Sequence, residues 1–584
     1  MRKRRHAARQ GGRTRTYKGS RIRCLSSSRL PRSGIVYSAL PLRRPGQIHI
    51  QHPRGEKHMH TPIHDRGLRG LASTLALAAL AACGGGGGAP AENARSEPAS
   101  AAAQTASDDA NATVTADTRA TAAACDAPAP MAVPATGTVV GNGTPQSCTL
   151  QALAQAVEAG GHVTFACGSA PVTIAVTREL RAPQNTVIDG GNLVTLDGGG
   201  KNRILVSGNN RSLSVRNLRF VNGAAAPTME GEGIGGAVSG PYLNRIEVIH
   251  STFENNTAGR GGGAVGVGTA GSLVIAGSTF KNNGAWYGGA VYSLLSPLTV
   301  VNSVFQGNSA NTSGKLGDGG AIGTDGASAS PNDAQGGEVR ICGTQITGNT
   351  GRGNGGGAYL WVYPPDRITI DRTTVANNHA EPNGRNNPGT GGGMRVSNGA
   401  ITIRNSSFLA NASDGNGGAL YLDCAPSCAI RNSTFQGNSA KSYGGAIFGD
   451  GHQDSNVTFA GNSAGGHGGA LFGKNFTLRN TVFVDNTAGN PWKQALSCSS
   501  TGTGDHVVQW QSATANGGGD RCIQNVTAAN PLLAAPADNG GPTPTMLPGS
   551  GSALLKAGAG CEATDQRGVA RDTSRCDIGA VEVR

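Results

Sequence analysis

Three copies of a short motif place side chains that could do chemistry at matching positions. In the copies that end at Ala419, Ala446 and Ala470, an aromatic residue stands two places after the alanine and an ionisable residue two places further on. These residues are Tyr421 with Asp423, Phe448 with Asp450, and Phe472 with Lys474, and Tyr292 follows an earlier copy in the same way. Residues two apart on a strand share a face. The sequence therefore predicts an outward column of aromatic rings beside a charged column.

Such a face has the residue types that bind a sugar chain. We expect Tyr292, Tyr421, Phe448 and Phe472 to be the substrate-binding residues, because rings cover the apolar faces of sugars while polar groups bind the hydroxyls. Asp423 and Asp450 on adjacent coils would lie about 5 Å apart, near the carboxylate separation of retaining glycosidases. A lyase would instead use Lys474 or an arginine as the base. Only that lyase would require a cation, such as Ca²⁺, on the acids, and no other cofactor is expected.

The same three ionisable residues also have a purely structural interpretation. Asp450 and Gly451 form a common turn pair, and Asp423 precedes the short loop between Cys424 and Cys428. Both interpretations of Asp423, Asp450 and Lys474, catalytic and structural, stay open at this point. No metal site is expected, since no histidine follows Cys424 and Cys428 at zinc-finger spacing.

Long loops in the middle of the chain are a second candidate site. Residues 311–318, 323–337 and 379–390 would extend from neighbouring coils, and binding residues often lie on such loops. Their polar residues and close neighbours are Lys315, Asp325, Asp333, Trp361, Tyr363, Asp366, His379, Glu381 and Arg385. The sequence has no zinc-protease, P-loop or calcium-binding repeat motif, and a solvated role is the alternative for His379.

Sequence repeats define the elements that must position these residues. Nine copies of Gly-Gly, followed by Ala in eight copies and by Met394 in the ninth, alternate with nine copies of an apolar residue followed three places later by Asn. The position after this Ala or Met, which we expect to point inward in most copies, is Val238, Val265, Val291, Ile322, Tyr359, Arg395, Leu420, Ile447 or Leu471. The apolar/Asn pairs are Phe253/Asn256, Phe280/Asn283, Phe305/Asn308, Ile346/Asn349, Val375/Asn378, Phe408/Asn411, Phe435/Asn438, Phe459/Asn462 and Phe483/Asn486. Alternating strands within a repeat of this length are typical of a β-solenoid coil.

Stacking of coils gives each repeated residue a structural role. Coils about 4.8 Å apart share backbone hydrogen bonds, so equivalent side chains form ladders. The Phe residues would make an apolar column, and each Asn would hydrogen-bond the next Asn and the turn backbone. The Gly-Gly pair would supply positive φ and close approach at a corner. We assign the Asn and Gly ladders no catalytic role.

The alternation of Gly-Gly-Ala with Phe-x-x-Asn resembles the polymorphic outer-membrane protein repeats and, more broadly, the pectin-lyase-like β-helices. This resemblance implies an all-β fold, a single-stranded right-handed parallel β-helix, which we place at residues 136–490. Residues 148–156 look like the N-terminal cap helix of such proteins, and residues 162–167 look like the first strand. The resemblance leaves the activity open, because the fold carries lyases, hydrolases and adhesins.

The last part of the chain, residues 491–584, resembles the C-terminal choice-of-anchor module of secreted β-helix proteins. The matching stretches are residues 538–545, 547–550, 564–569 and 576–582. Two of its cysteines, Cys561 and Cys576, are close enough in sequence to suggest a disulfide. We therefore expect a small disulfide-bearing module after the helix.

The N-terminal region predicts export and lipid attachment. Residues 59–82 have the form of a signal peptide whose apolar run is too short to span a bilayer. Leu80-Ala81-Ala82-Cys83 resembles the lipobox of bacterial lipoproteins, which implies lipidation of Cys83, and Gly84 after it favours the outer membrane in that family. A plain secretory signal is the alternative. Residues 1–58 would be an over-extended start or a basic arm, and residues 83–135 have the composition of a disordered tether.

Charge and cysteine content narrow the partners and the compartment. Residues 1–82 hold 18 of the 49 Lys and Arg and 2 of the 36 acids, so the remainder carries 31 − 34 = −3. A nucleic-acid surface needs basic residues on the folded part, and nucleic acid is therefore excluded as a partner. The ten cysteines after Cys83 fit an oxidising compartment. Sequence proximity suggests the pairs Cys148–Cys167, Cys424–Cys428, Cys498–Cys522 and Cys561–Cys576, leaving Cys125 and Cys342 to pair or stay free.

Three functions are compatible with these features. The first is a cell-surface lipoprotein that acts as an adhesin or a polysaccharide-binding scaffold. The second is a polysaccharide lyase or glycoside hydrolase, and the third is a structural spacer of the envelope. We expect a monomer that contacts the outer membrane through its lipid alone, faces the periplasm or the exterior, and binds a polysaccharide or a cell-surface glycan.

Overall fold

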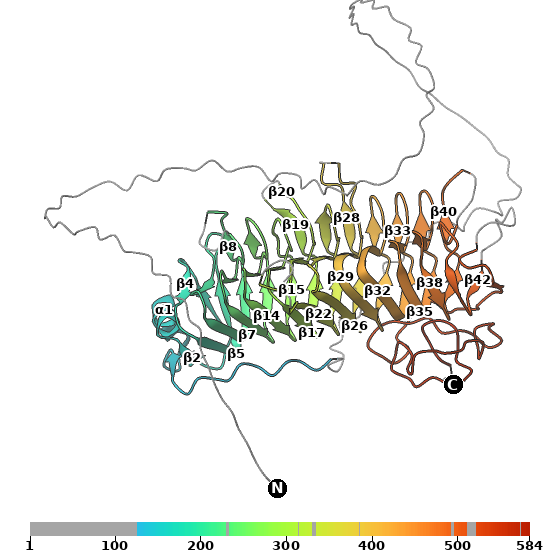
Figure 1. The fold of residues 1–584 in the computed structure, drawn as a ribbon. Coiled ribbons are helices and arrows are strands. Elements are labelled where there is room, and N and C mark those ends of the chain that lie inside the picture. The colour runs from blue at the N-terminus through green and yellow to red at the C-terminus, as the bar shows by residue number, and fades with distance from the viewer. Residues whose placement is uncertain are drawn as a thin grey trace, which may run out of the picture. The chain divides into compact units, whose positions relative to one another are not determined.

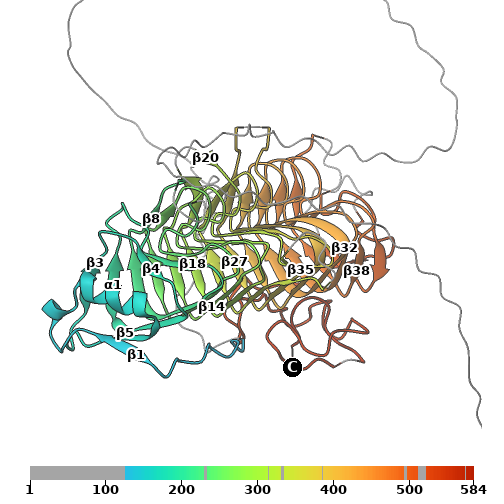
Figure 2. The same cartoon turned by 60° about the vertical axis from the view of Figure 1, so that its left-hand side comes forward.

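The chain folds into stacked β-coils. The computed structural model describes residues 125–228, 233–312, 315–329, 335–384, 386–491, 496–510, 521–572 and 574–583. Strands pair in parallel with the equivalent strands of the neighbouring coils (Figure 1), except that β20 (Lys315–Leu316) pairs antiparallel with β19 (Ser309–Thr312). The coils lie one behind another along a common axis (Figure 2). Crossovers between parallel strands of one sheet are right-handed, and the fold is the predicted right-handed parallel β-helix. The signal peptide, Cys83 and residues 83–124 of the predicted tether lie outside the described residues.

Four ladders of strands run along the helix. The ladder that follows the Gly-Gly motif contains β9 (Val238–Gly240), β13 (Val265–Val267), β16 (Val291–Leu294), β21 (Ile322–Asp325), β25 (Ala358–Trp361), β29 (Met394–Arg404), β32 (Leu420–Gln436), β34 (Ile447–Phe448) and β37 (Leu471–Phe472). The second contains β10 (Arg245–Ile249), β14 (Ser272–Ala276), β17 (Leu298–Val301), β22 (Glu338–Cys342), β26 (Arg367–Asp371), the ends of β29 and the middle of β32, β35 (His452–Ala460), β38 (Thr477–Arg479) and β41 (Thr503–Asp505).

The third ladder carries the predicted Phe positions. It contains β7 (Ser212–Val221), β11 (Thr252–Glu254), β15 (Thr279–Lys281), β18 (Val304–Gln306), β23 (Gln345–Thr347), β27 (Thr374–Ala376), β30 (Ser407–Leu409), the ends of β32 and β35, β39 (Val482–Val484) and β42 (Val508–Trp510). The fourth ladder has short strands: β8 (Ala224–Ala225), β12 (Thr257–Ala258), β19 (Ser309–Thr312), β24 (Thr350–Arg352), β28 (His379–Glu381), β31 (Ala412–Ser413), β33 (Ser439–Ala440), β36 (Ser463–Ala464) and β40 (Thr487–Ala488).

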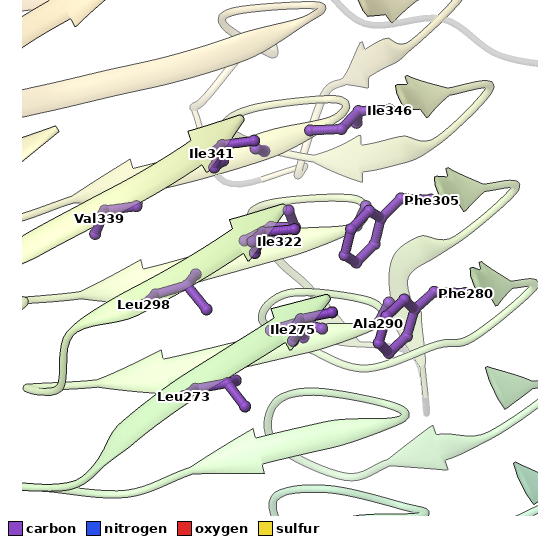
Figure 3. Close-up of a cluster of buried hydrophobic side chains, with 14 of the residues drawn as sticks. Leu273, Ile275, Phe280, Ala290, Leu298, Phe305, Ile322, Val339, Ile341 and Ile346 are labelled. Carbon is purple, nitrogen blue, oxygen red and sulfur yellow. The ribbon is translucent and has the colours of Figure 1, made fainter. Parts of the chain in front are cut away.

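The core is a set of side-chain columns along the inside of the coils. Phe253, Phe280 and Phe305 stack with centroids 4.8 and 4.7 Å apart and planes within 5° of parallel. Figure 3 shows Phe280 and Phe305 in line with Ile346, beside columns of Leu, Ile and Val from the other ladders. A second stack joins Phe408, Phe435, Phe459 and Phe483. All of these rings are buried, as the repeat pattern predicts.

The Asn ladder and the Gly-Gly corner also have their predicted roles. Asn411 donates from Nδ2 to Asn438 Oδ1 at 2.9 Å, and Asn438 donates in the same way to Asn462 at 2.9 Å. Each of these amides also donates to a backbone carbonyl of the preceding coil, as Asn438 does to Phe408 at 2.9 Å. At the corner, Gly262 has a φ of +62°, and a Cβ on Gly263 would lie 2.3 Å from the Gly289 carbonyl oxygen.

Two coils depart from the predicted register. Ala358 pairs with Ile322, and Met394 pairs with both Ala358 and Leu420. Ala358 and Met394 therefore occupy the inward position that the sequence assigned to Tyr359 and Arg395, which instead stand one place later, on the outer face. The cause is an additional glycine before each of these strands, because Gly357 and Gly393 take the place of the usual alanine.

The N-terminal end is capped, and residues 125–136, which we call the strap, run back along the coils. Helix α1 (Leu150–Ala159) begins at Thr149, whose hydroxyl accepts a hydrogen bond from the Ala152 backbone, and it ends at Gly160 with a φ of +75°. Strand β1 (Gly137–Val140) precedes the cap helix, strand β2 (Gly161–Phe165) follows it, and the two strands pair in parallel. The folded part begins earlier than the predicted residue 136, since Cys125 forms a disulfide with Cys342, 217 residues away. The four pairs suggested by sequence proximity are also disulfides.

The C-terminal segment folds back on the side of the coils. The coils continue past residue 490 through β41, β42 and β43 (Thr527–Ala528). The chain beyond them then contacts a column of turn asparagines: Asn432 Nδ2 donates to the Thr564 carbonyl at 2.8 Å, and Asn480 Nδ2 donates to the Ala559 carbonyl at 3.0 Å. These contacts hold the module against the helix.

Candidate functional site

The three aromatic residues of the last Gly-Gly-Ala copies form one stack on the outside of the helix. Tyr421 on β32, Phe448 on β34 and Phe472 on β37 pair in successive coils. Their ring centroids lie 4.8 and 5.1 Å apart, with planes inclined by 21° and 9°. The rings are half-buried. Stacking occupies both faces of Phe448, whereas in the coil after Phe472 the equivalent residue is not aromatic, because Leu471 pairs with Cys498 and Ser499 follows.

The stack is the floor of a hollow of about 860 Å³. The three rings share this lining with all three predicted ionisable residues, Asp423, Asp450 and Lys474. His467, Ser499, Ser500 and the Cys424–Ala425 edge of the disulfide loop complete the polar part of the wall. The structure therefore brings together six of the seven side chains named from the sequence.

Asp423 is held by two neighbours on the preceding coil. Its Oδ2 accepts a hydrogen bond from Ser397 Oγ at 2.7 Å and forms an ion pair with the Arg395 guanidinium at 3.2 Å. The same guanidinium lies 4.5 Å from the Tyr421 ring centroid and donates to Asn354 Oδ1 at 2.6 Å. Arg395 thus orients Asp423 and covers the end of the ring stack.

The phenol of Tyr421 is kept protonated by its surroundings. Burial raises its pKa most, the charges of Asp423 and Asp450 raise it further, and Arg395 acts in the opposite direction. A protonated phenol can donate a hydrogen bond as well as accept one. Tyr421 therefore offers the hollow both an apolar ring and a hydroxyl donor.

Asp450 lies in a turn and not opposite Asp423 on a paired strand. The pairing of β32 with β34 ends at Tyr421 and Phe448, and the exposed Asp450 accepts a hydrogen bond from the Lys474 backbone N–H at 3.0 Å. Lys474 itself is exposed at the rim. The two carboxylates line one hollow, but one is fixed by an ion pair and the other by a turn.

Tyr292 does not belong to the hollow. Its side chain is 5% exposed, and its ring stacks on Tyr287 with centroids 6.1 Å apart. Burial raises the pKa of its phenol, with a smaller contribution from Asp325. Along the outer column, the residues between Tyr292 and Tyr421 are Gly323, Tyr359 and Arg395. The sequence correctly predicts that Tyr292 shares this column, but not that neighbouring side chains cover it.

Sequence reasoning missed three residues of the site. Tyr443 packs against Phe472 with centroids 4.7 Å apart, and His467 lies 6.2 Å from the Tyr443 ring. Both immediately precede a Gly-Gly pair, a position that the motif search did not compare across coils. Arg395 was missed because its register was assigned one place early. Each of these residues could have been found by aligning the coils on the glycine with positive φ, which is the first glycine of its run in every copy except the one at Gly262.

Among the described residues of the central loops, the predicted polar groups do not come together in a second site. Asp366 is buried and accepts hydrogen bonds from the backbone N–H groups of Ala327 at 2.8 Å and Gly337 at 2.6 Å, a structural role. Tyr363 donates from its hydroxyl to Asp325 at 2.7 Å, and burial followed by this hydrogen bond raises its pKa to about 12. Trp361 stands beside Tyr359 on β25.

Further along the chain, His379 pairs with Asp414 and Glu381 with Arg352 on the fourth ladder. These contacts form a line of surface charges outside the hollow. Asp333, Arg385 and the Lys315 side chain lie outside the described residues. Within the described ranges, no group of three or more His, Cys, Asp or Glu side chains is placed to hold a metal ion, and no helix is long and apolar enough to cross a membrane.

Three stretches of the chain match the Chlamydia polymorphic membrane protein repeat: residues 250–267, 432–450 and 456–474. The chain thus contains stretches similar to polymorphic membrane protein repeats. The last two stretches include Phe448 with Asp450 and Phe472 with Lys474. Half of the residues that line the candidate hollow therefore lie in the matched stretches.

The solved structures that are similar to this chain are distant from it in sequence. The periplasmic alginate epimerase AlgG is 13% identical over 64% of this chain and 84% of its own, with a TM-score of 0.34. PfbA, a surface adhesin of Streptococcus pneumoniae, is 12% identical over 64% and 93%, with a TM-score of 0.32. Pectate lyase Pel9A is 14% identical over 74% and 91%, with a TM-score of 0.29. Values this low leave the activity of this chain open, and no curated protein matches it.

Proposed function

We propose that this protein binds a polysaccharide through the hollow at Tyr421, Phe448 and Phe472, and that it does so at the cell envelope or surface. The observation that carries the proposal is the half-buried ring stack, which leaves apolar surface open in a hollow whose rim is polar. Ligand sites commonly combine an apolar lining with a few placed polar groups. A sugar ring has the complementary surface, with apolar C–H groups on its faces and hydroxyls at its edge.

The stacking geometry determines which ring surfaces a sugar can contact. Because Phe448 is stacked on both sides, it can offer mainly its edge to a ligand. Phe472 ends the stack and has a serine, not a ring, in the following coil. Tyr443 also packs against Phe472, so we expect one sugar residue to contact the part of Phe472 that lines the hollow, with its hydroxyls toward Ser499, Ser500 and Lys474.

Binding without cleavage is the function that the polar contacts favour. A hydrolase needs one carboxyl group free to transfer a proton and a second placed across the scissile bond. Asp423 is instead held by Arg395 and Ser397, and Asp450 by the turn at Lys474. A glycoside hydrolase or lyase using Asp423, Asp450 and Lys474 is the second candidate, since these three groups do line one hollow.

Incubation of the purified protein with uronic-acid and neutral polysaccharides separates these functions. We expect retention of at least one polysaccharide without new reducing or unsaturated ends. New ends that disappear in Asp423→Asn and Asp450→Asn variants would establish an enzyme instead. If the protein neither retains nor cleaves any of the polysaccharides, the result would favour a structural spacer of the envelope.

Lipid attachment at Cys83 is the proposed means of holding the protein at the outer membrane. The polymorphic membrane protein repeats support an envelope or surface location, and the lipobox-like residues Leu80-Ala81-Ala82-Cys83 support a lipid anchor. We predict that Cys83→Ala abolishes incorporation of labelled fatty acid, because the thiol is the acceptor. Label retained by Cys83→Ala at the wild-type level would contradict the anchor.

A further inference from the structure

The charges around the hollow discriminate between classes of polysaccharide. Resting on the proposed glycan-binding function, we infer that the hollow takes a neutral or amino-sugar chain and excludes polyuronates. A polyuronate carries one carboxylate on each sugar, and its binding site must supply cations to match. The lining of this hollow instead holds more carboxylates than Lys or Arg side chains.

Two carboxylates and one ammonium group belong to the lining. Asp423 and Asp450 stand beside the ring stack, and Lys474 is the single Lys or Arg among the lining residues. Asp450 has its Oδ1 on the Lys474 backbone N–H, which leaves its charge uncompensated by that contact. Asp423 is matched by Arg395, so a uronate placed on the rings would meet mainly the charge of Asp450, and like charges a few ångströms apart repel measurably even through water.

Arg395 is the nearest further cation, and its charge is already matched by Asp423. Its side chain is 20% exposed, and its guanidinium forms the ion pair with Asp423, donates to Asn354 Oδ1 and lies over the Tyr421 ring. A uronate that bound to Arg395 would share the guanidinium with Asp423, so that one cation would face two carboxylates. Such sharing is less favourable than the existing pair, because each carboxylate is then only partly compensated.

The remaining polar groups suit hydroxyl, acetamido or ammonium groups. Ser499 and Ser500 are hydroxyl partners, and the protonated phenol of Tyr421 is a donor. Asp450 is an exposed acceptor that could pair with a sugar ammonium. An amino-sugar chain would therefore gain an ion pair at the position where a uronate chain meets repulsion.

Matched hexasaccharides test this inference with the full mature protein. The probes are cellohexaose as the neutral chain, a chitosan hexamer as the amino-sugar chain and an oligogalacturonate hexamer as the uronate, measured by calorimetry at low and at physiological salt. We expect the neutral or the amino-sugar probe to bind at least about tenfold more tightly than the uronate, and this affinity ratio should be smaller at physiological salt than at low salt. Asp450→Asn, which changes an exposed turn residue, should lower the affinity ratio several-fold, and Asp423→Asn/Asp450→Asn should lower it further.

The outcomes separate this inference from the proposed function. Uronate binding as tight as that of the neutral probe overturns the inference and leaves glycan binding intact. Tight uronate binding that appears only with added Ca²⁺ also overturns it, since the acids would then hold the ion. Failure of all three probes to bind overturns the proposed function and the inference with it.

Discussion

The ring of Phe448 stacks on the ring of Phe472, with centroids 5.1 Å apart and planes inclined by only 9°. This spacing is close to the rise of one coil, so the outer aromatic column follows the same geometry as the inner Phe column. The two columns differ in burial. The inner rings are enclosed by the coils, whereas the outer rings are half-exposed and form the floor of a hollow. One repeat therefore produces a structural ladder inside and a candidate binding floor outside.

The inner column predicts a large effect of truncating one ring. Phe435 is fully buried between Phe408 and Phe459, with centroids 4.8 and 5.0 Å away. We expect Phe435→Ala to lower the free energy of unfolding by about 3–5 kcal/mol, because it leaves a cavity in a close-packed column. Urea unfolding measures this change. The exposed Gln453→Ala is the matched control and should stay within about 0.5 kcal/mol of the wild type, and equal midpoints for the two variants would show that the column is not a packed core.

The disulfides should differ in their contributions to stability. Cys125–Cys342 spans 217 residues, whereas Cys424–Cys428 spans 4. Chain entropy predicts about 5 kcal/mol for the long loop and about 2 kcal/mol for the short one. Thermal unfolding of the Cys125→Ser/Cys342→Ser variant should therefore begin well below that of Cys424→Ser/Cys428→Ser. The opposite order would mean that the strap adds little to the coils that it crosses.

The surface pair at Asp414 predicts a pH dependence in the acid range. Partial burial by itself raises the pKa of Asp414, but hydrogen bonds from Lys441 at 2.8 Å and His379 at 3.0 Å outweigh burial and lower it overall. A carboxyl whose pKa is lower in the folded state stabilises the fold above its unfolded pKa of about 3.9, and that stabilisation is lost as pH falls through the folded pKa. The stability difference between wild type and Asp414→Asn should therefore be constant near pH 6 and shrink below about pH 4.

Denaturant midpoints of both proteins from pH 6 to pH 3 provide this measurement. Lys441→Met is the companion variant, because it removes one of the two groups that lower the Asp414 pKa and should reproduce part of the effect. A difference that stays the same across the whole range would show that Asp414 titrates alike in the folded and unfolded chains.

The repeat makes the fold predictable from the sequence, and its irregularities limit the prediction of the site. Phe435 and Asn438 could be placed correctly because the same residue types recur at the same spacing in neighbouring copies. The stacking of equivalent residues then fixes Phe435 in the inner column and Asn438 in the turn column. Tyr359 and Arg395 could not, because a third glycine shifts the register of their coils by one residue. A one-residue shift moves a side chain to the other face of a strand, and this shift hid the partner of Asp423.

Exposure of the outer column was the other feature that the sequence left undetermined. Tyr292 and Phe472 occupy the same column, yet Tyr287 and neighbouring groups cover Tyr292, while Phe472 is followed by a serine coil and borders the hollow. Which outer rings stay accessible depends on turns of variable length, and these have no repeated pattern. The burial of Tyr292 and the joining of Tyr421, Phe448 and Phe472 could therefore be distinguished only in three dimensions.

The half-exposed rings are better tested one at a time than together. Replacing all three with Ser would remove three aromatic pairs, including that of Tyr443 with Phe472, and each aromatic pair contributes about 0.5–1.5 kcal/mol beyond the burial of its area. Phe472→Ser removes the contacts of one ring with Phe448 and Tyr443 and leaves Tyr421 on Phe448 in place. This single variant therefore changes the candidate binding floor with a smaller effect on folding than the triple replacement.

The affinity of Phe472→Ser for a polysaccharide retained by the wild type is the most direct test that the hollow is a glycan site. Losing one ring contact of about 1.4 kcal/mol corresponds to a tenfold weaker affinity. We therefore expect about tenfold weaker binding by Phe472→Ser in calorimetry, and unchanged binding by Gln453→Ser, which alters an exposed residue outside the hollow. Wild-type affinity in a folded Phe472→Ser protein would contradict the assignment of the hollow as the binding site.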